Sequence, residues 1–258
     1  MIHVDSWGVA GSVQDAGRPG RAWLGAGRGG AVDLPSLALA NRLVGNGESF
    51  AAFETSGGLT ISLTKPTMVA VTGGVAHVTV EGGPPVGWGM PVVLPAGATM
   101  RVGRMLLGAR VYVAVRGGVV NRGDAMHAGP DPQTGAATQP AARREPSTNV
   151  RIWPGPRLDW FDGDALLTLT SKPFLVTDTS RVGTRLRGGA LHRVRHGELP
   201  SEGMVEGAMQ VPPDGNPIVM LAGYPATGGY PVIAVVDPVD IHLVAQAPVG
   251  TELHFLPA

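Results

Sequence analysis

Short apolar runs dominate the chain, and most of them are too short for helices. Residues 59–63 and 75–80 alternate between apolar positions and polar or small ones, which is the period of a strand. Residues 111–115, 218–221 and 232–236 are apolar throughout and are bounded by turn-forming residues. These runs predict short strands, and therefore an all-β fold.

A few stretches favour helices instead. Asp33 is a good N-cap, Pro35 fits a first helical turn, and Gly45 ends the apolar periodicity that starts at Leu34. Two shorter helices are predicted at 164–169 and 239–246. The predicted fold is all-β with a few short helices.

Glycine and proline separate these runs. The chain has 39 Gly and 23 Pro, and they stand between apolar runs, as in barrels and sandwiches. Residues 121–149 have no periodicity, so we expect a mobile surface connection between an N-terminal part, 1–120, and a C-terminal part, 150–258.

Residues 1–32 are polar and broken by glycine. Because they have few apolar side chains to bury, we expect their own hydrogen bonds or a partner to hold them.

The composition excludes several classes of protein. The 258 residues contain no Cys, which rules out thiolate metal sites and thiol nucleophiles. Twenty basic and 20 acidic residues balance to a net charge of zero, which argues against a nucleic-acid or membrane surface. No signal peptide or membrane-length apolar run is visible, so we expect the cytoplasm.

No self-contained catalytic signature is present. Gly25, Gly27 and Gly30 match a dinucleotide-binding spacing, but no apolar strand precedes them. His192 and His196 have a metal-ligand spacing, but arginines that would repel a cation surround them. We therefore predict no metal site.

Polar residues gather instead in glycine- and proline-rich frames at the two ends of the chain. Such frames fix the backbone and leave amide groups accessible to a ligand oxygen. The first set is Gln14, Asp15, Arg18, Asn41 and Glu54, and the second is Ser201, Glu202, Gln210, Asp214, Thr227 and Tyr230. Glu54 follows apolar residues, a setting in which a carboxylate is usually solvated.

These residues lie in strings that resemble a known family. The strings are SVQDAGRPG, GAVD-x(3)-LALANRLVGN, FE-x-S-G-G, SEG-x-V-x-GA-x-QVPPDG-x-PIV-x-LA and TGGYP-x-IAVV. In this order, over about residues 1–118 and 150–256, they resemble allophanate hydrolase subunit 2, also called KipA or the C subunit of 5-oxoprolinase, whose homologues form half of the carboxyltransferase domain of urea carboxylase.

The resemblance implies two cyclophilin-like β-barrel subdomains and an ATP-dependent 5-oxoprolinase. Such a chain works with a KipI-like B subunit, of the allophanate hydrolase subunit 1 family, and with a third, A subunit. Together they convert the lactam 5-oxoproline to glutamate, and ATP and Mg²⁺ enter at the level of the complex. Biotin, where a relative uses it, would arrive on another chain, because no A-M-K-M-like carrier motif occurs here.

The resemblance also suggests roles for residues. Arg18 and the amides of Gly228 and Gly229 would hold an anionic oxygen, and Glu54 or Asp15 would transfer a proton or serve a metal. Tyr230 and Gln210 would position the substrate. The further candidates for substrate binding are Gln14, Asn41, Glu202 and Thr227.

Three departures from the family keep other functions open. The family's LGSRSTD-like segment is absent from 121–148, Gly223 replaces an Asp, and Val232 replaces a Lys. The alternatives are half of a biotin-dependent carboxyltransferase and a KipA-like regulatory protein without chemistry of its own.

Overall fold

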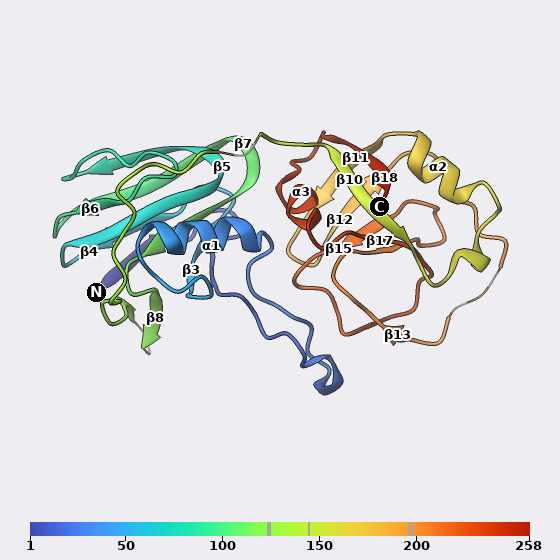
Figure 1. Ribbon diagram of the computed structural model, residues 1–258, viewed down its shortest axis with the longest axis horizontal. Coiled ribbons are helices and arrows are strands. Elements are labelled where there is room, and N and C mark those ends of the chain that lie inside the picture. The colour runs from blue at the N-terminus through green and yellow to red at the C-terminus, as the bar shows by residue number, and fades with distance from the viewer. Residues whose placement is uncertain (123–124, 144, 196, 198) are drawn as a thin grey trace. The chain divides into compact units, whose positions relative to one another are not determined.

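The computed structural model describes residues 1–258 except 123–124, 144, 196 and 198. The chain forms two compact units. Unit 1 consists of Met1–Ala16 and Asp33–Glu145, and unit 2 consists of Gly17–Val32 and Pro146–Ala258. Each unit is built around its own sheet (Figure 1).

Unit 1 is built on a nine-stranded sheet with the order β2-β3-β7-β4-β1-β9-β8, and β5 pairs with both β7 and β6. Its strands are β1 (Ile2–Ser6), β2 (Ser12–Gln14), β3 (Ala52–Thr55), β4 (Thr60–Leu63), β5 (Thr67–Glu81), β6 (Val92–Leu94), β7 (Thr99–Val115), β8 (Val119–Arg122) and β9 (Ala125–Ala128).

Strands β5 and β7 are longer than the sequence predicts. The apolar runs at 68–71 and 75–80 suggested two strands, yet β5 runs continuously for 15 residues. Register shifts beside Gly73 let the β5–β7 ladder continue where the apolar pattern breaks. Glycine therefore marks a bulge here and not a turn.

Helix α1 (Leu34–Leu43) forms as predicted and packs on β5 and β7. The Asp33 side chain accepts a hydrogen bond from the Ser36 amide at 2.9 Å, and Pro35 lies in the first turn. The main apolar core of unit 1 contains Phe53, Val71 and Val113.

Unit 2 is a closed seven-stranded barrel with the order β10-β17-β14-β15-β12-β11-β18. Its strands are β10 (Asn149–Pro154), β11 (Phe174–Thr179), β12 (Gly183–Arg187), β14 (Ala208–Gln210), β15 (Ile218–Met220), β17 (Val232–Val236) and β18 (Glu252–Pro257). A separate two-stranded ribbon pairs β13 (Glu202–Gly203) with β16 (Thr227–Gly228).

The helices of unit 2 are short. They are α2 (Ala165–Ser171) and α3 (Ile241–Gln246), with single turns of 3₁₀ helix at η1 (Ala22–Leu24) and η2 (Leu158–Trp160). Asp164 precedes α2 as predicted but makes no side-chain capping bond. The predicted turn at 211–215 is present, and its Gly215 amide donates to the Pro212 carbonyl at 3.0 Å.

These findings confirm the all-β class with two barrel-like sheets and a few short helices. Two segments differ from the sequence-based boundaries. Residues 17–32 group with the C-terminal residues, and β9 lies inside the expected connection 121–149, of which 123–124 and 144 are outside the described residues. No helix among the described residues is long and apolar enough to cross a membrane.

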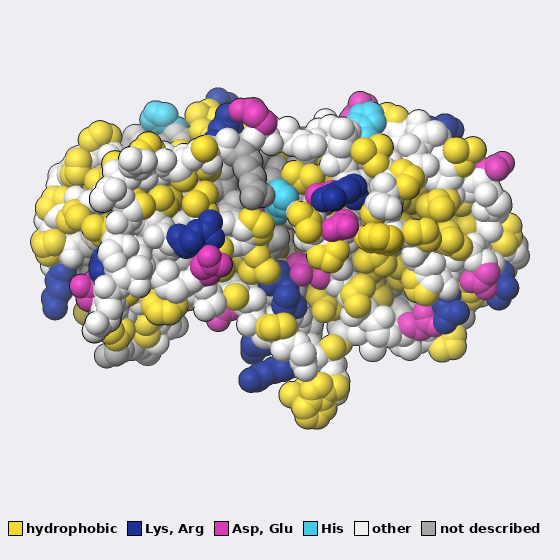
Figure 2. Space-filling model, viewed as in Figure 1, with side chains coloured by type: hydrophobic (Ala, Val, Ile, Leu, Met, Phe, Trp, Pro, Cys, Tyr) yellow, Lys and Arg dark blue, Asp and Glu magenta, His cyan; other side chains and the backbone are white. Residues whose placement is uncertain are grey.

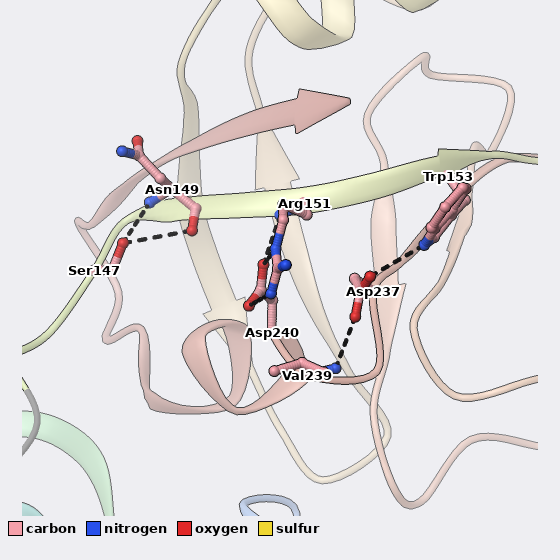
Figure 3. Close-up of polar contacts among 7 residues, drawn as sticks. All are labelled: Ser147, Asn149, Arg151, Trp153, Asp237, Val239 and Asp240. Carbon is pink, nitrogen blue, oxygen red and sulfur yellow. Dashed lines mark hydrogen bonds and ion pairs between the residues drawn. The ribbon is translucent and has the colours of Figure 1, made fainter. Parts of the chain in front are cut away.

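A salt bridge joins β10 to the start of α3 (Figure 3). The Arg151 guanidinium donates to both Asp240 carboxylate oxygens, at 2.8 and 2.9 Å, and the Arg151 amide donates to one of them at 2.9 Å. Asp240 is buried. The hydrogen bonds from Arg151 hold the pKa of the Asp240 carboxyl below its usual 3.8.

Replacing Asp240 with Asn tests this bridge, because the change removes the charge and keeps the shape. We expect D240N to lower the free energy of unfolding of unit 2 by about 1 kcal/mol near neutral pH, because solvent screens the half-exposed Arg151 partner. Because the folded pKa lies below the unfolded one, the stabilisation is present above about pH 4 and is lost as the pH falls through the folded pKa. Urea unfolding at neutral pH and in acid measures both effects.

Asp178→Asn is the control, since Asp178 is exposed on β11. It should change stability little at either pH. A D240N deficit that stays the same in acid would contradict the assignment of the stabilisation to the ionised carboxylate.

Candidate functional site

A row of polar side chains crosses the sheet of unit 1. The register aligns Ser12 of β2 with Glu54 of β3, Glu54 with Tyr112 of β7, and Tyr112 with Thr72 of β5. Residues directly opposite each other in a sheet share a face. Their neighbours along the strands, Phe53 among them, enter the apolar core, so this polar row lies on the other face.

Glu54 and Tyr112 form the centre of the polar row. The Tyr112 hydroxyl donates to a Glu54 carboxylate oxygen at 2.8 Å and accepts a hydrogen bond from the Asp33 amide at 2.9 Å. The Thr72 hydroxyl donates to the Ser36 carbonyl at 2.7 Å. Tyr112 and Thr72 therefore tie the first turn of α1 to the polar row.

The pKa of Tyr112 is well above its usual value of 10.0. Burial is the main cause, and the neighbouring charges of Glu54 and Asp33 raise the pKa further. The phenol therefore remains protonated at physiological pH and remains a donor to Glu54.

Glu54 is fully buried, with 0% of its surface exposed, so the expectation that it is solvated is wrong. A buried carboxylate needs hydrogen-bond donors, and the Tyr112 hydroxyl is one. A carboxylate held in this way, away from bulk water, has the chemistry of a general base or a charge-stabilising group.

The other candidates of unit 1 differ in their surroundings. Gln14 is half-buried at the end of β2, and its amide donates to the Ser12 hydroxyl at 3.1 Å. Asp15 is exposed. Asn41 is buried within α1, where its amide donates to the Phe50 carbonyl at 2.7 Å and its oxygen accepts from Asn46 at 2.9 Å. These bonds give Asn41 a structural role in holding the loop after α1.

In unit 2, the ribbon of β13 and β16 places Glu202 opposite Gly228. The Glu202 carboxylate forms a salt bridge with both Nε and a terminal nitrogen of Arg157. Arg157 was not singled out from the sequence, because it lies just before η2 and outside the predicted sets of polar residues. Thr227 is exposed beside Gly228.

Gln210 lies at the end of β14 with 4% of its surface exposed. Its amide donates to the Tyr230 carbonyl at 3.2 Å, and the Tyr230 side chain is exposed. A Cβ atom added at Gly228 would lie 2.4 Å from the Gln210 amide nitrogen. Gly228 is therefore the residue that leaves space for the Gln210 side chain.

Arg18 belongs to the segment 17–32 of unit 2, which we call the arm. Its amide donates to the Arg28 carbonyl at 2.7 Å. Arg28, another residue that sequence reasoning missed, binds Glu206 through two contacts of 2.7 Å. Gly27 approaches the Tyr224 carbonyl so closely that an added Cβ would lie 2.3 Å from it. Gly27 therefore lets the arm pack closely against the backbone at Tyr224.

Metal ligands do not gather in the part of the chain that the structure describes. No group of three or more His, Asp or Glu side chains there is placed to hold a metal ion. A surface pocket of about 320 Å³ is lined in part by His192, Arg193, Arg195 and Asp214. His196, which the sequence pairs with His192, lies outside the described residues.

The structure therefore assembles each predicted set only in part. In unit 1, a hydrogen bond joins Glu54 to Tyr112, which lies within an apolar run of the sequence and was not among the predicted site residues. Gln14 lies at the end of the neighbouring strand β2. In unit 2 the structure places the Gln210 side chain beside Gly228, and this side chain donates to the Tyr230 carbonyl. Only the pairing of β3 with β7 shows that Tyr112 lies beside Glu54.

The match to a family covers nearly the whole chain. The family model described as carboxyltransferase domain, subdomain A and B, matches residues 24–122 and 119–257. The C subunit of 5-oxoprolinase from Escherichia coli K12 is 31% identical over 283 aligned residues, covering 99% of this chain and 91% of that protein.

Solved structures agree. The crystal structure of TTHA0988 is 34% identical with a TM-score of 0.83, covering 99% of this chain but 55% of that longer chain. The Kluyveromyces lactis urea carboxylase is 22% identical with a TM-score of 0.89, covering 99% of this chain and 27% of that chain, and it shares the fold. The chain therefore belongs to the carboxyltransferase domain family and contains both its A and B subdomains.

Proposed function

We propose that this chain is the C subunit of a heteromeric, ATP-dependent 5-oxoprolinase. The observation that carries the proposal is the nearly full-length likeness to the E. coli protein of that name. The buried Glu54–Tyr112 pair supports it, because a chain without chemistry has little need for a carboxylate sealed in a sheet.

The proposed reaction opens a stable lactam. The lactam oxygen attacks the γ-phosphorus of ATP and ADP leaves, which makes the ring carbon electrophilic. Water adds to that carbon and the ring C–N bond breaks, leaving an acyl phosphate. A second water molecule attacks the acyl carbon and releases phosphate and glutamate. The work of the protein is to position the groups and stabilise the developing charge.

Each candidate residue has a proposed part in this reaction. Glu54, or the exposed Asp15, transfers a proton. Arg18 and the Gly228–Gly229 amides stabilise the anionic oxygen. Gln210 and Tyr230 position the substrate, with further contacts from Gln14, Glu202 and Thr227.

Partners supply the rest of the proposed enzyme. They are a KipI-like subunit and a third subunit, and the name of the E. coli relative, which calls it a subunit, supports such an assembly. ATP and Mg²⁺ enter at the level of the complex.

A biotin-dependent carboxyltransferase half is the second candidate function. The name of the family model and the fold shared with the K. lactis urea carboxylase favour it. A KipA-like regulatory role is the third, favoured by Gly223 and Val232, where the family has charged residues. Carboxyl transfer from carboxybiotin to urea without use of 5-oxoproline would favour the second.

Glu54→Gln in the assembled complex tests the proposed function. We expect the wild-type chain, assembled with its KipI-like and third subunits, to hydrolyse ATP faster when 5-oxoproline is present. Gln keeps an oxygen that can accept from Tyr112 but cannot take a proton, so E54Q should lower the stimulated kcat about 100-fold or more. Coupled measurement of ADP and glutamate provides the readout.

Glu48→Gln is the matched control, because Glu48 is an exposed carboxylate of the same unit. It should retain wild-type turnover. Unstimulated ATPase in an intact wild-type complex would contradict the proposed function, and full activity of E54Q would remove Glu54 from the chemistry.

Gly228→Ala tests the position of Gln210. The new methyl group would displace the Gln210 amide, so we expect kcat/KM for 5-oxoproline to fall about tenfold, as the loss of one orienting contact does. The displaced group ends a flexible side chain, so thermal unfolding should change little. Enzyme kinetics and calorimetry separate the two effects.

Gly203→Ala is the control, because Gly203 lies in the same ribbon as Gly228 and no atom of the described residues lies within 4 Å of a Cβ added there. It should leave kcat/KM nearly unchanged. Equal losses in both variants would show that Gly228 acts through the loop as a whole and not through Gln210.

A further inference from the structure

The arm, Gly17–Val32, is held at its base by bonds to the rest of unit 2. Arg28 binds the Glu206 carboxylate through two contacts and donates to the Ala31 carbonyl at 2.9 Å. The Gly29 amide donates to the Ala222 carbonyl at 2.9 Å, and Arg181 donates to the Gly30 carbonyl. Arg28 and Glu206 are largely shielded from solvent, so the base of the arm is fixed.

The tip of the arm is also ordered by its own bonds. The turn η1 is closed by the Leu24 amide, which donates to the Arg21 carbonyl at 3.0 Å, and by the Gly25 amide, which donates to the Ala22 carbonyl at 2.9 Å. Gly25 ends the turn with a φ of 76°, a left-handed conformation that favours glycine. The tip therefore presents its side chains in a defined arrangement.

Those side chains are apolar and unusually exposed. Trp23 is 81% exposed and Leu24 is 58% exposed. No hydrogen bond or ring contact joins Trp23 to any residue that the structure describes, whereas the exposed Trp153 donates its indole N–H to Asp237. The arm is the dark blue turn at the bottom of Figure 1. In the same view, Figure 2 shows hydrophobic side chains at its end, with Lys or Arg side chains beside them.

The charge of the arm indicates what would cover the tip. The arm contains Arg18, Arg21 and Arg28 and no Asp or Glu. Arg28 is bound to Glu206, and Arg21 is exposed next to the turn. An exposed tryptophan with an arginine two residues away has the composition of an interface hot spot, and its partner surface would be an apolar pocket edged by carboxylates.

The comparisons favour further polypeptide of the same enzyme as the partner. TTHA0988 continues well beyond the matched region, since this chain spans 55% of it, and the E. coli relative is named as one subunit of an enzyme. A chain of this family is thus part of a longer polypeptide in TTHA0988, and the E. coli relative is named as one subunit among others. We infer that Trp23 and Leu24 at the tip of the arm insert into an apolar, acid-edged pocket on the KipI-like subunit of the complex. This inference rests on the proposed function.

The test is the affinity between the full chain and the purified KipI-like subunit, measured by calorimetric titration. We expect W23A/L24A to weaken the affinity about 30-fold or more, as the loss of a hot spot does. Arg21→Glu should slow association at low salt, and added salt should reduce that difference. Because the side chains of Trp23 and Leu24 are largely exposed, thermal unfolding of the variants should match that of wild type.

Leu167→Ala/Val249→Ala is the matched control, since both residues are exposed apolar side chains of unit 2. It should bind like wild type. Equal affinities of W23A/L24A and wild type would overturn the inference, and 5-oxoproline-stimulated ATPase of the wild-type complex would still support the proposed function. A wild-type chain that does not bind the KipI-like subunit would overturn both.

The tip could instead bind one of two other partners, and each gives a distinct experimental result that would overturn the inference. If sedimentation shows that wild-type chain self-associates and W23A/L24A does not, the tip binds a second copy and the inference is wrong. If wild type, but not W23A/L24A, binds vesicles of anionic phospholipid, the tip binds a lipid surface and the inference is wrong as well.

Discussion

The buried Glu54 carboxylate is the constraint around which unit 1 is arranged. A carboxylate without donors in a protein interior is destabilised by several kcal/mol, so the sheet must bring a donor to it. The register of β3 on β7 does this with Tyr112, whose raised pKa keeps the proton on the phenol. The same hydroxyl accepts a hydrogen bond from the Asp33 amide. The Tyr112 hydroxyl oxygen therefore links the start of α1 to the Glu54 carboxylate. Removing either member would disturb both the polar row and the helix.

In unit 2, polar loops outside the closed barrel are held in a fixed arrangement. Salt bridges between sequence-distant residues hold them, such as Arg157 with Glu202 and Arg28 with Glu206. Gly228 contributes by having no side chain, which leaves space for Gln210. These loops are held by the salt bridges and by a small apolar cluster that includes Met204 and Tyr224. They can therefore present polar and apolar groups to other molecules in a fixed arrangement.

Local sequence patterns predicted the parts of the fold that depend on local chemistry. The capping of α1 by Asp33, the turn at 211–215 and the strand at 232–236 follow from residue type and spacing alone. The continuous β5 and β7 did not, because a glycine inside a ladder looks the same in sequence as one in a turn. The grouping of 17–32 with the C-terminal residues depends on Arg28 meeting Glu206, and no local pattern predicts a contact between residues so far apart in sequence. The family strings contain Glu54 and Gln210, which remain predicted site residues, whereas Tyr112 could be placed beside Glu54 only from the register.

The most direct measurement of the central claim, that this chain helps to activate a lactam, follows the lactam oxygen itself. 5-Oxoproline labelled with ¹⁸O at the ring carbonyl would be turned over by the complete complex, with the KipI-like and third subunits present, and the inorganic phosphate analysed by mass spectrometry. The account predicts one labelled oxygen in each phosphate released, because that oxygen attacks the γ-phosphorus and then leaves with the phosphate when water attacks the acyl carbon. Label found only in the glutamate carboxylate, with none in phosphate, would contradict it.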